Sequence, residues 1–229
     1  MTTVLLIRHG RSTANTAGVL AGRTPGIDLD EHGRDQAVRL AARLAEVALD
    51  AVLCSPLERT RQTAQPLLAA RPDTLFELDE RFTECDYGTW SGRTLKSLAE
   101  EPLWRTVQAH PAAASFPDGE SLAAVSARAV SAVRSWNAKL GEHATYAVVS
   151  HGDVIKAIAA DALGMHLDLF QRLQIDPCSL TVVRYHGTRP AVLRVNDVGS
   201  DVSALIRAVV PEAGAAGDAP VGGGAGAGG

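Results

Sequence analysis

Two short apolar segments of this chain each run directly into a His-Gly pair. The first ends in Arg8-His9-Gly10 and the second in Ser150-His151-Gly152. Continuous apolar runs of this length, rich in β-branched residues, are typical of strands buried on both faces of a parallel sheet. A glycine after each histidine lets the backbone turn tightly where the strand ends. The pattern therefore favours a sheet that carries polar side chains at the ends of its strands.

Helix-like stretches alternate with strand-like ones along the rest of the chain. Asp30 is a good N-cap, and apolar residues recur at helical spacing from Ala37 to Val47. Further helices are predicted from Pro56 and over 121–140 and 154–163, and further strands over 50–55, 74–78, 179–185 and 190–195. This alternation predicts a three-layer α/β/α sandwich with a mostly parallel sheet. The last two strands are joined too tightly for a crossover, so at least one edge strand should be antiparallel.

Length and charge restrict the class of protein further. The chain has 229 residues and a formal net charge of −4, which suits one α/β domain and gives no sign of a nucleic-acid or membrane partner. From residue 208 the composition collapses to Ala, Gly and Pro, which predicts a disordered tail over 208–229 after a domain at 1–207. The oligomeric state is left open, with a homodimer as one alternative.

Cysteine use and hydropathy bear on the compartment. The three cysteines are widely spaced and form no Cys-x-x-Cys motif, which fits a reducing cytosol. The apolar run before Arg8 is too short for a signal peptide, and no run approaches the ~20 residues that cross a bilayer. We therefore expect a cytoplasmic protein.

Three predicted strands end in polar residues that could share one site. They are followed by Arg8-His9-Gly10, by the segment Ser55–Arg59, and by His151-Gly152. Ligands of α/β sheets sit at the carboxyl ends of such strands, so two imidazoles and two guanidiniums would meet there. Arginine offers bidentate donors to a tetrahedral oxyanion, and backbone N–H groups at the next helix start, Gly152 among them, add more. A histidine among them can act as a nucleophile toward phosphorus.

Five blocks in a fixed order make this pattern specific. They are Leu6–Gly10 with Ser12 and Asn15, Leu29 with Gly33 and Gln36-Ala37, Ser55–Ala64, Glu84–Gly92, and Gly119–Ser121 with Arg128 and the segment Val149–Gly152. In these blocks the chain resembles the histidine phosphatase superfamily, also called the phosphoglycerate mutase-like family. The resemblance extends to about residue 200 and points to its phosphatase-type branch.

The resemblance implies a role for each site residue. His9 is expected to be the nucleophile that becomes phosphohistidine, and Glu84 the general acid that protonates the leaving alkoxide and then takes a proton from water. The phosphoryl oxygens are expected to contact Arg8, Arg59 and His151, with Asn15 at the rim. The two arginines and a protonated His151 can neutralise the transferring group without Mg²⁺. We thus expect a metal-independent, acid-type phosphatase that needs no cofactor and acts on a small phosphorylated metabolite.

Two positions depart from the family's common pattern. Arg11 stands where most relatives have Glu or Gln, and it either faces the pocket, where it would bind a second anionic group, or points into solvent. Cys85 and Asp86 stand where the cofactor-dependent mutases have two basic residues. The loss of that basic pair favours a phosphatase over a phosphomutase, which remains the nearest alternative.

Other readings are weaker. A metallohydrolase could use His9, Glu84 and His151 as ligands, but two neighbouring arginines would repel a dication. A non-catalytic domain that binds a phosphorylated ligand would have no need of Glu84. Residues 96–118 are predicted to form a lid whose aromatic side chains either contact the substrate or pack locally.

Overall fold

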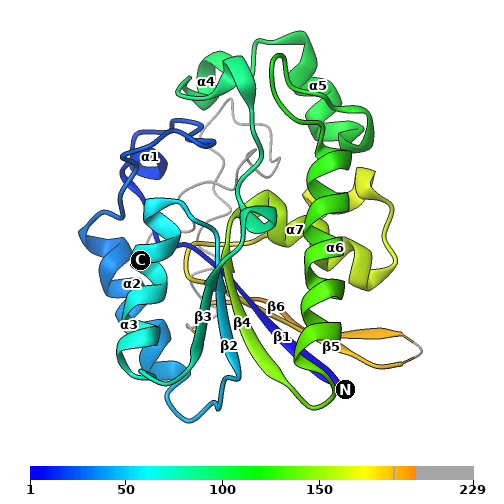
Figure 1. Cartoon of the computed structure of the whole chain (residues 1–229). Helices are drawn as coiled ribbons and strands as arrows, with labels where there is room; N and C mark the ends of the chain where they lie inside the picture. Colours follow the sequence, from blue (N-terminus) through cyan, green and yellow to red (C-terminus); the bar gives the residue numbers. More distant parts are fainter. Residues whose placement is uncertain (188, 200–229) are drawn as a thin grey trace.

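A six-stranded sheet forms the centre of the protein (Figure 1), whose computed structural model describes residues 1–187 and 189–199. Its strand order is β3-β2-β4-β1-β5-β6. The strands are β1 (Thr2–Arg8), β2 (Ala51–Cys54), β3 (Leu75–Leu78), β4 (Thr145–Ser150), β5 (Leu180–Tyr185) and β6 (Pro190–Asp197). The predicted tail at 208–229 lies outside the described residues.

Pairing within the sheet confirms the expected mixture of directions. The pairs β3–β2, β2–β4 and β4–β1 are parallel, whereas β5 is antiparallel to both β1 and β6. The short connection between the last two strands predicted antiparallel pairing for β5 and β6 alone. The β1–β5 pair arises because β5 returns beside the central strand, a long-range contact that local sequence does not encode. The three-layer α/β/α prediction is confirmed.

Helices cover both faces of this sheet (Figure 1). α2 and α3 lie on one face, and α6 and α7 lie on the other. The α-helices are α1 (Thr13–Thr16), α2 (Glu31–Arg43), α3 (Glu58–Ala69), α4 (Leu95–Leu98), α5 (Pro102–Ala109), α6 (Leu122–Leu140) and α7 (Gly152–Leu163). Single turns of 3₁₀ helix occupy Glu80–Phe82, Gly88–Trp90 and Pro111–Ala113, and a longer 3₁₀ segment occupies Leu167–Arg172.

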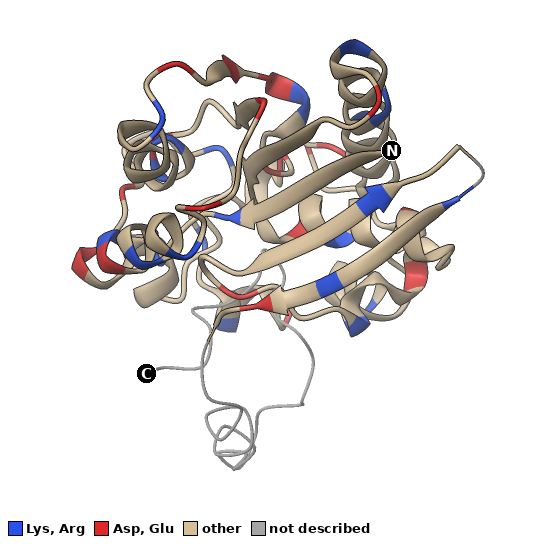
Figure 2. Ribbon diagram, turned by 90° about the horizontal axis from the view of Figure 1, so that it is seen from below, with Lys and Arg blue, Asp and Glu red and all other residues tan. Residues whose placement is uncertain are grey.

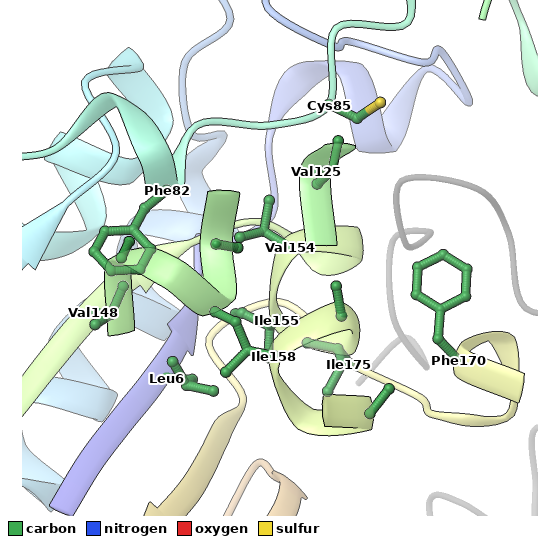
Figure 3. Packing of buried hydrophobic residues seen from close by; sticks show 14 of the residues in the cluster. Leu6, Phe82, Cys85, Val125, Val148, Val154, Ile155, Ile158, Phe170 and Ile175 are labelled. Carbon is green, nitrogen blue, oxygen red and sulfur yellow. The ribbon is translucent and has the colours of Figure 1, made fainter. Parts of the chain in front are cut away.

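The central strand shows why its sequence is continuously apolar. Val4 and Leu6 belong to the buried cluster beneath α6 and α7, whereas Leu5 and Ile7 belong to the cluster beneath α2 and α3. Successive side chains of a strand point to opposite faces, so a strand covered on both sides is apolar along its middle, here from Val4 to Ile7. Figure 3 shows the α7 side of this packing, where Ile155 and Ile158 lie in the same cluster as Leu6.

Helix ends follow the predicted capping signals in most places. The Asp30 carboxylate accepts from the Gly33 N–H, and Ser121 caps α6, which ends before Gly141. α3 begins at Glu58 rather than at Pro56, because Leu57 is still extended. α7 begins directly at Gly152, two residues earlier than the apolar spacing predicted. His151 therefore lies at the junction of strand and helix.

The predicted lid lies beyond the carboxyl ends of the parallel strands, where α4 and α5 are found (Figure 1). Its aromatic residues pack on one another. Trp104 stacks on Trp90 with ring centroids 6.2 Å apart, and Phe116 meets Trp90 edge-on at 5.2 Å. Trp90 and Phe116 are buried. Local packing thus accounts for these two side chains.

Charged residues of both signs are distributed over several helices and strands (Figure 2). None of the helices in the described ranges combines the length and apolar character that crossing a membrane requires.

Candidate active site

The parallel pairing of β1 with β4 brings two histidines together. Arg8 lies opposite Ser150 at the carboxyl end of the pair, so His9 and His151 leave neighbouring strands at the same level. The His9 N–H donates to the Ser150 carbonyl over 2.9 Å. The two imidazole centroids are 5.3 Å apart, and both side chains are buried. Residues 142 positions apart in the sequence therefore form one centre.

Hydrogen bonding defines which nitrogen of His9 can react. Nδ1 lies 2.7 Å from the Gly10 carbonyl oxygen, which can only accept, so Nδ1 carries the proton. Nε2 therefore keeps its lone pair. The Gly10 N–H donates to the Thr63 hydroxyl over 3.0 Å and holds the turn on α3. A side chain at Gly10 would collide with the Gly33 carbonyl oxygen, 2.5 Å from a Cβ there, so only glycine fits this turn.

His151 has the opposite tautomer. Its Nδ1 lies 3.3 Å from Nη2 of Arg59, which can only donate, so Nδ1 accepts. Nε2 then carries the proton and donates to the Ser55 hydroxyl over 2.8 Å. Ser55 follows β2, the strand next to β4, and is completely buried. Ser55 lies in one of the family blocks, but its sequence position alone does not predict this contact with His151.

Two arginines lie beneath the histidines, and both are 1% exposed. Arg8 donates to the Ile175 carbonyl over 2.7 Å, and Arg59 donates to the Gly22 carbonyl over 2.8 Å. Nη1 of Arg59 is buried and has no hydrogen-bond partner within residues 1–187 and 189–199. Burial lowers the pKa of Arg8 to about 10 and also lowers that of Arg59. Arg8 still carries its positive charge at neutral pH, so the centre favours an anion.

Glu84 contributes a carboxyl group to the same centre. Its Oε2 lies 4.0 Å from Nδ1 of His151, and its Oε1 accepts from the Cys85 N–H over 2.9 Å. Burial, and secondarily the nearby carboxylate of Asp153, raises the pKa of Glu84 to about 7, against the opposing effect of Arg59. A substantial fraction of Glu84 is thus protonated at neutral pH.

The same burial affects both imidazoles. Desolvation, then the charges of Arg59 and Arg8, lower the pKa of His9 well below 6.5. Desolvation and Arg59 do the same to the pKa of His151. The sequence interpretation counted His151 as a cation, which this environment does not support. The positive charge of the pocket comes from its arginines.

Three other predicted site residues have defined positions. Asn15 is turned toward its own helix, where its Oδ1 accepts from the Ser12 N–H and hydroxyl. Arg11 is paired through Nε with Asp30 at 2.6 Å, so it does not simply extend into solvent. Gly152 is the first residue of α7 and places its N–H at a helix N-terminus. Contact of Asn15, Arg11 and Gly152 with substrate remains a prediction.

Sequence reasoning missed a second basic pair. Arg23 and Arg128 both donate to the Glu84 carbonyl oxygen, over 2.9 and 3.2 Å. Both also bond to the Glu120 carboxylate, which accepts from the Asp86 N–H as well. This network fixes the backbone that carries Glu84. Arg128 and Glu120 were recognised as part of a block, whereas Arg23 lies in a loop with no distinguishing signal.

Comparison with known proteins identifies the family of the chain. The sequence model of the histidine phosphatase superfamily (branch 1) matches residues 4–198. The chain therefore belongs to the histidine phosphatase superfamily, which confirms the resemblance noted in the sequence.

Individual relatives cover most of the chain. The chain is 32% identical over 204 residues to phosphoserine phosphatase 1 of Hydrogenobacter thermophilus, and the match covers 86% of this chain and 92% of that protein. A probable phosphoglycerate mutase of Erwinia tasmaniensis is 31% identical over 185 residues, covering 80% and 85%. The solved structure of YhfR from Bacillus stearothermophilus superposes with a TM-score of 0.80 at 28% identity, covering 86% and 98%. The relatives thus include both a phosphatase and a mutase.

The hydrogen bonds and burial around the histidines lead to a test by NMR. Both imidazoles should be neutral at pH 6.5, with the proton on Nδ1 of His9 and on Nε2 of His151. Long-range ¹H–¹⁵N spectra of the ring nitrogens distinguish these states, and His9→Gln and His151→Gln assign the signals. An imidazolium signal from either residue at pH 6.5 would contradict the description of the pocket.

Proposed function

We propose that the protein is a metal-independent phosphatase that hydrolyses a small phosphomonoester through a phosphohistidine on His9. The observation that carries this proposal is the lone pair on Nε2 of His9 beside two buried guanidinium groups. Nη1 of Arg59, without a hydrogen-bond partner in the described part of the chain, suits a phosphoryl oxygen of the substrate. The match to a phosphoserine phosphatase supports the same class of reaction.

In the first step, Nε2 of His9 attacks phosphorus as the bond from phosphorus to the ester oxygen breaks. The charge spread over the equatorial oxygens is balanced by Arg8 and Arg59, with the Gly152 N–H as a further donor. Glu84, protonated because its pKa is raised to about 7, gives its proton to the departing alkoxide. Because His9 is neutral beforehand, the phosphoryl group meets an available lone pair.

In the second step, water attacks the phosphohistidine and the bond between phosphorus and Nε2 breaks. Glu84 is now a carboxylate, and it takes the proton that the water loses. Inorganic phosphate leaves, and both His9 and Glu84 return to their starting states. The raised pKa of Glu84 serves both steps, because a carboxyl group that loses its proton reluctantly is also a stronger base.

Hydrolysis fits the surroundings of Glu84 better than transfer to a second hydroxyl group. Cys85 is fully buried, and the Asp86 carboxylate accepts from the Gly88 N–H. Neither residue offers the positive charge that would hold a second phosphate beside the first, and the two arginines nearby, Arg23 and Arg128, are already bonded to the Glu120 carboxylate. We propose phosphoserine-like monoesters of aliphatic alcohols as the substrate class, on the similarity to phosphoserine phosphatase 1. The three free, buried cysteines fit a protein of the reducing cytoplasm.

Metal independence follows from the buried arginines, because two guanidinium groups beside the histidines repel a dication and already balance the phosphoryl charge. Turnover should therefore survive exhaustive dialysis against EDTA, and added Zn²⁺ or Mg²⁺ should not raise it. Released phosphate measures this directly. Loss of turnover on chelation, with recovery on adding one of these ions, would refute the arginine mechanism.

Replacing the carboxyl group of Glu84 tests its role as proton donor. Glu84→Gln should slow hydrolysis of an aliphatic phosphomonoester by roughly 10²- to 10⁴-fold, the usual range for loss of a general acid. The loss should be much smaller for p-nitrophenyl phosphate, whose leaving group needs no proton. Wild-type activity toward the aliphatic ester should fall as the pH rises through about 7, where Glu84 loses its proton.

The matched control is Glu142→Gln, an exposed carboxylate whose loss should leave both rates unchanged. Equal losses for the two leaving groups in Glu84→Gln would show that Glu84 is not the proton donor.

A further inference from the structure

Two oppositely charged residues are buried at the start of α7, and the steps described above assign no role to either of them. Asp153 and Lys156 are 0% and 1% exposed, and Nζ of Lys156 lies 3.9 Å from Oδ1 of Asp153. Removing a carboxylate and an ammonium group from water costs desolvation free energy, and their mutual attraction does not always offset that cost. A pair kept in such a place calls for an explanation beyond stability.

Covalent and hydrogen-bonded links connect this pair to the catalytic centre. Asp153 follows His151 by two residues, and Nδ1 of His151 lies 4.0 Å from Oε2 of Glu84. Oδ2 of Asp153 accepts from the Tyr87 hydroxyl over 2.8 Å, and Tyr87 follows Glu84 by three residues. Asp153 is thus tied to both segments that carry the reacting groups. Lys156 extends the other way and donates to Gln171 over 2.8 Å.

Within residues 1–187 and 189–199, charged and titratable groups act on Glu84 from several elements. They are Asp153 and Lys156 of α7, Arg8 of β1, Arg59 of α3, His151 after β4, Arg128 of α6, Arg23 of the first loop, and Cys85 and Tyr87 on its own segment. Asp153 opposes the arginines in its effect on Glu84 and, after burial itself, contributes most to the raised pKa. Burial lowers the pKa of Arg8, and the carboxyl groups of Glu84, Asp176 and Asp153 oppose this effect.

A simpler account is that Asp153 stabilises α7, because acidic residues are favoured in the first turn of a helix. That account explains a carboxylate at this position, but it gives no reason for a buried lysine one turn later or for the bond to Tyr87. It also predicts no effect on the pH dependence of catalysis. The two accounts can therefore be separated by experiment.

We propose that Asp153, with Lys156 as a counter-ion, is a positioning residue whose negative charge determines the pH range in which Glu84 can donate a proton. This inference rests on the proposed function, in which Glu84 is the general acid. Asp153 touches neither substrate nor phosphorus. Its charge disfavours a second carboxylate nearby, so Glu84 keeps its proton until the alkoxide leaves and regains one readily from the attacking water.

Removing the charge of Asp153 and removing the charge of Lys156 should shift the pKa of Glu84 in opposite directions. Asp153→Asn keeps an acceptor for the Tyr87 hydroxyl but removes the negative charge, which lowers the pKa of Glu84. The alkaline limb of the kcat/KM profile should therefore shift to lower pH, by about one pH unit. Lys156→Met removes the opposing positive charge, so the same limb should shift to higher pH. Asp153→Asn should therefore lose activity at pH 7.5 and keep it at pH 5.5. The kcat/KM profile reports the protonation state of the free enzyme.

The experiment measures these profiles for the full chain with an aliphatic phosphomonoester and with p-nitrophenyl phosphate. Wild type, Asp153→Asn, Lys156→Met and Glu84→Gln are compared, and circular dichroism checks that each variant is folded. The shifts should appear only with the aliphatic ester. If Asp153→Asn does not fold, the upward shift in Lys156→Met alone decides the matter.

Limbs that stay in place, or that move in the same direction in both variants, would overturn the role of Asp153. The behaviour of Glu84→Gln separates this outcome from a failure of the proposed function. If Glu84→Gln loses the alkaline limb while the other two variants leave it unmoved, only the inference about Asp153 is wrong. If Glu84→Gln keeps the limb, Glu84 is not the general acid and the proposed function fails with it.

Discussion

Burial of two guanidinium groups under the ends of the central strands is the constraint from which the rest of the site follows. Arg8 and Arg59 are almost inaccessible, and their charges act through a medium that screens them weakly. Burial lowers the pKa of both histidines, and these two charges lower it further, which leaves His9 neutral. Glu84 stays partly protonated beside these arginines, because burial and the Asp153 carboxylate raise its pKa by more than the arginines lower it. A nucleophile, an anion pocket and a proton donor thus coexist near neutral pH.

The sheet positions this arrangement, because neighbouring elements hold several of the polar groups at the strand ends. Parallel pairing sets His9 beside His151, and the adjacent strand β2 presents Ser55 to His151. The turn after His9 is fixed on α3 through Thr63. On the antiparallel side, the N–H of Cys178 donates to the Arg8 carbonyl over 3.1 Å. Hydrogen bonds from several neighbouring elements thus fix the turns that carry the two histidines.

Local signals in the sequence predicted the elements of the fold well. Apolar strands of the right length, N-caps at Asp30 and Ser121, and the glycine that ends α6 all have short-range physical causes, and the family blocks located the residues of the centre. What escaped prediction depends on distant contacts. The pairing of β5 with β1, the attachment of Arg23 to the Glu84 backbone and the neutral state of His151 arise only when the chain is folded. Desolvation, in particular, cannot be read from residue spacing.

The central claim is that the lone pair of His9 accepts the phosphoryl group, and a trapped intermediate tests it most directly. With p-nitrophenyl phosphate labelled in its phosphoryl group, the leaving step is fast and the phosphorylated enzyme should accumulate. Rapid quenching in base, followed by digestion and mass spectrometry, should locate one phosphoryl group on His9, stable in base and lost in acid. A base-labile label on Ser12 or Ser55, or an undiminished label in His9→Ala, would contradict the account.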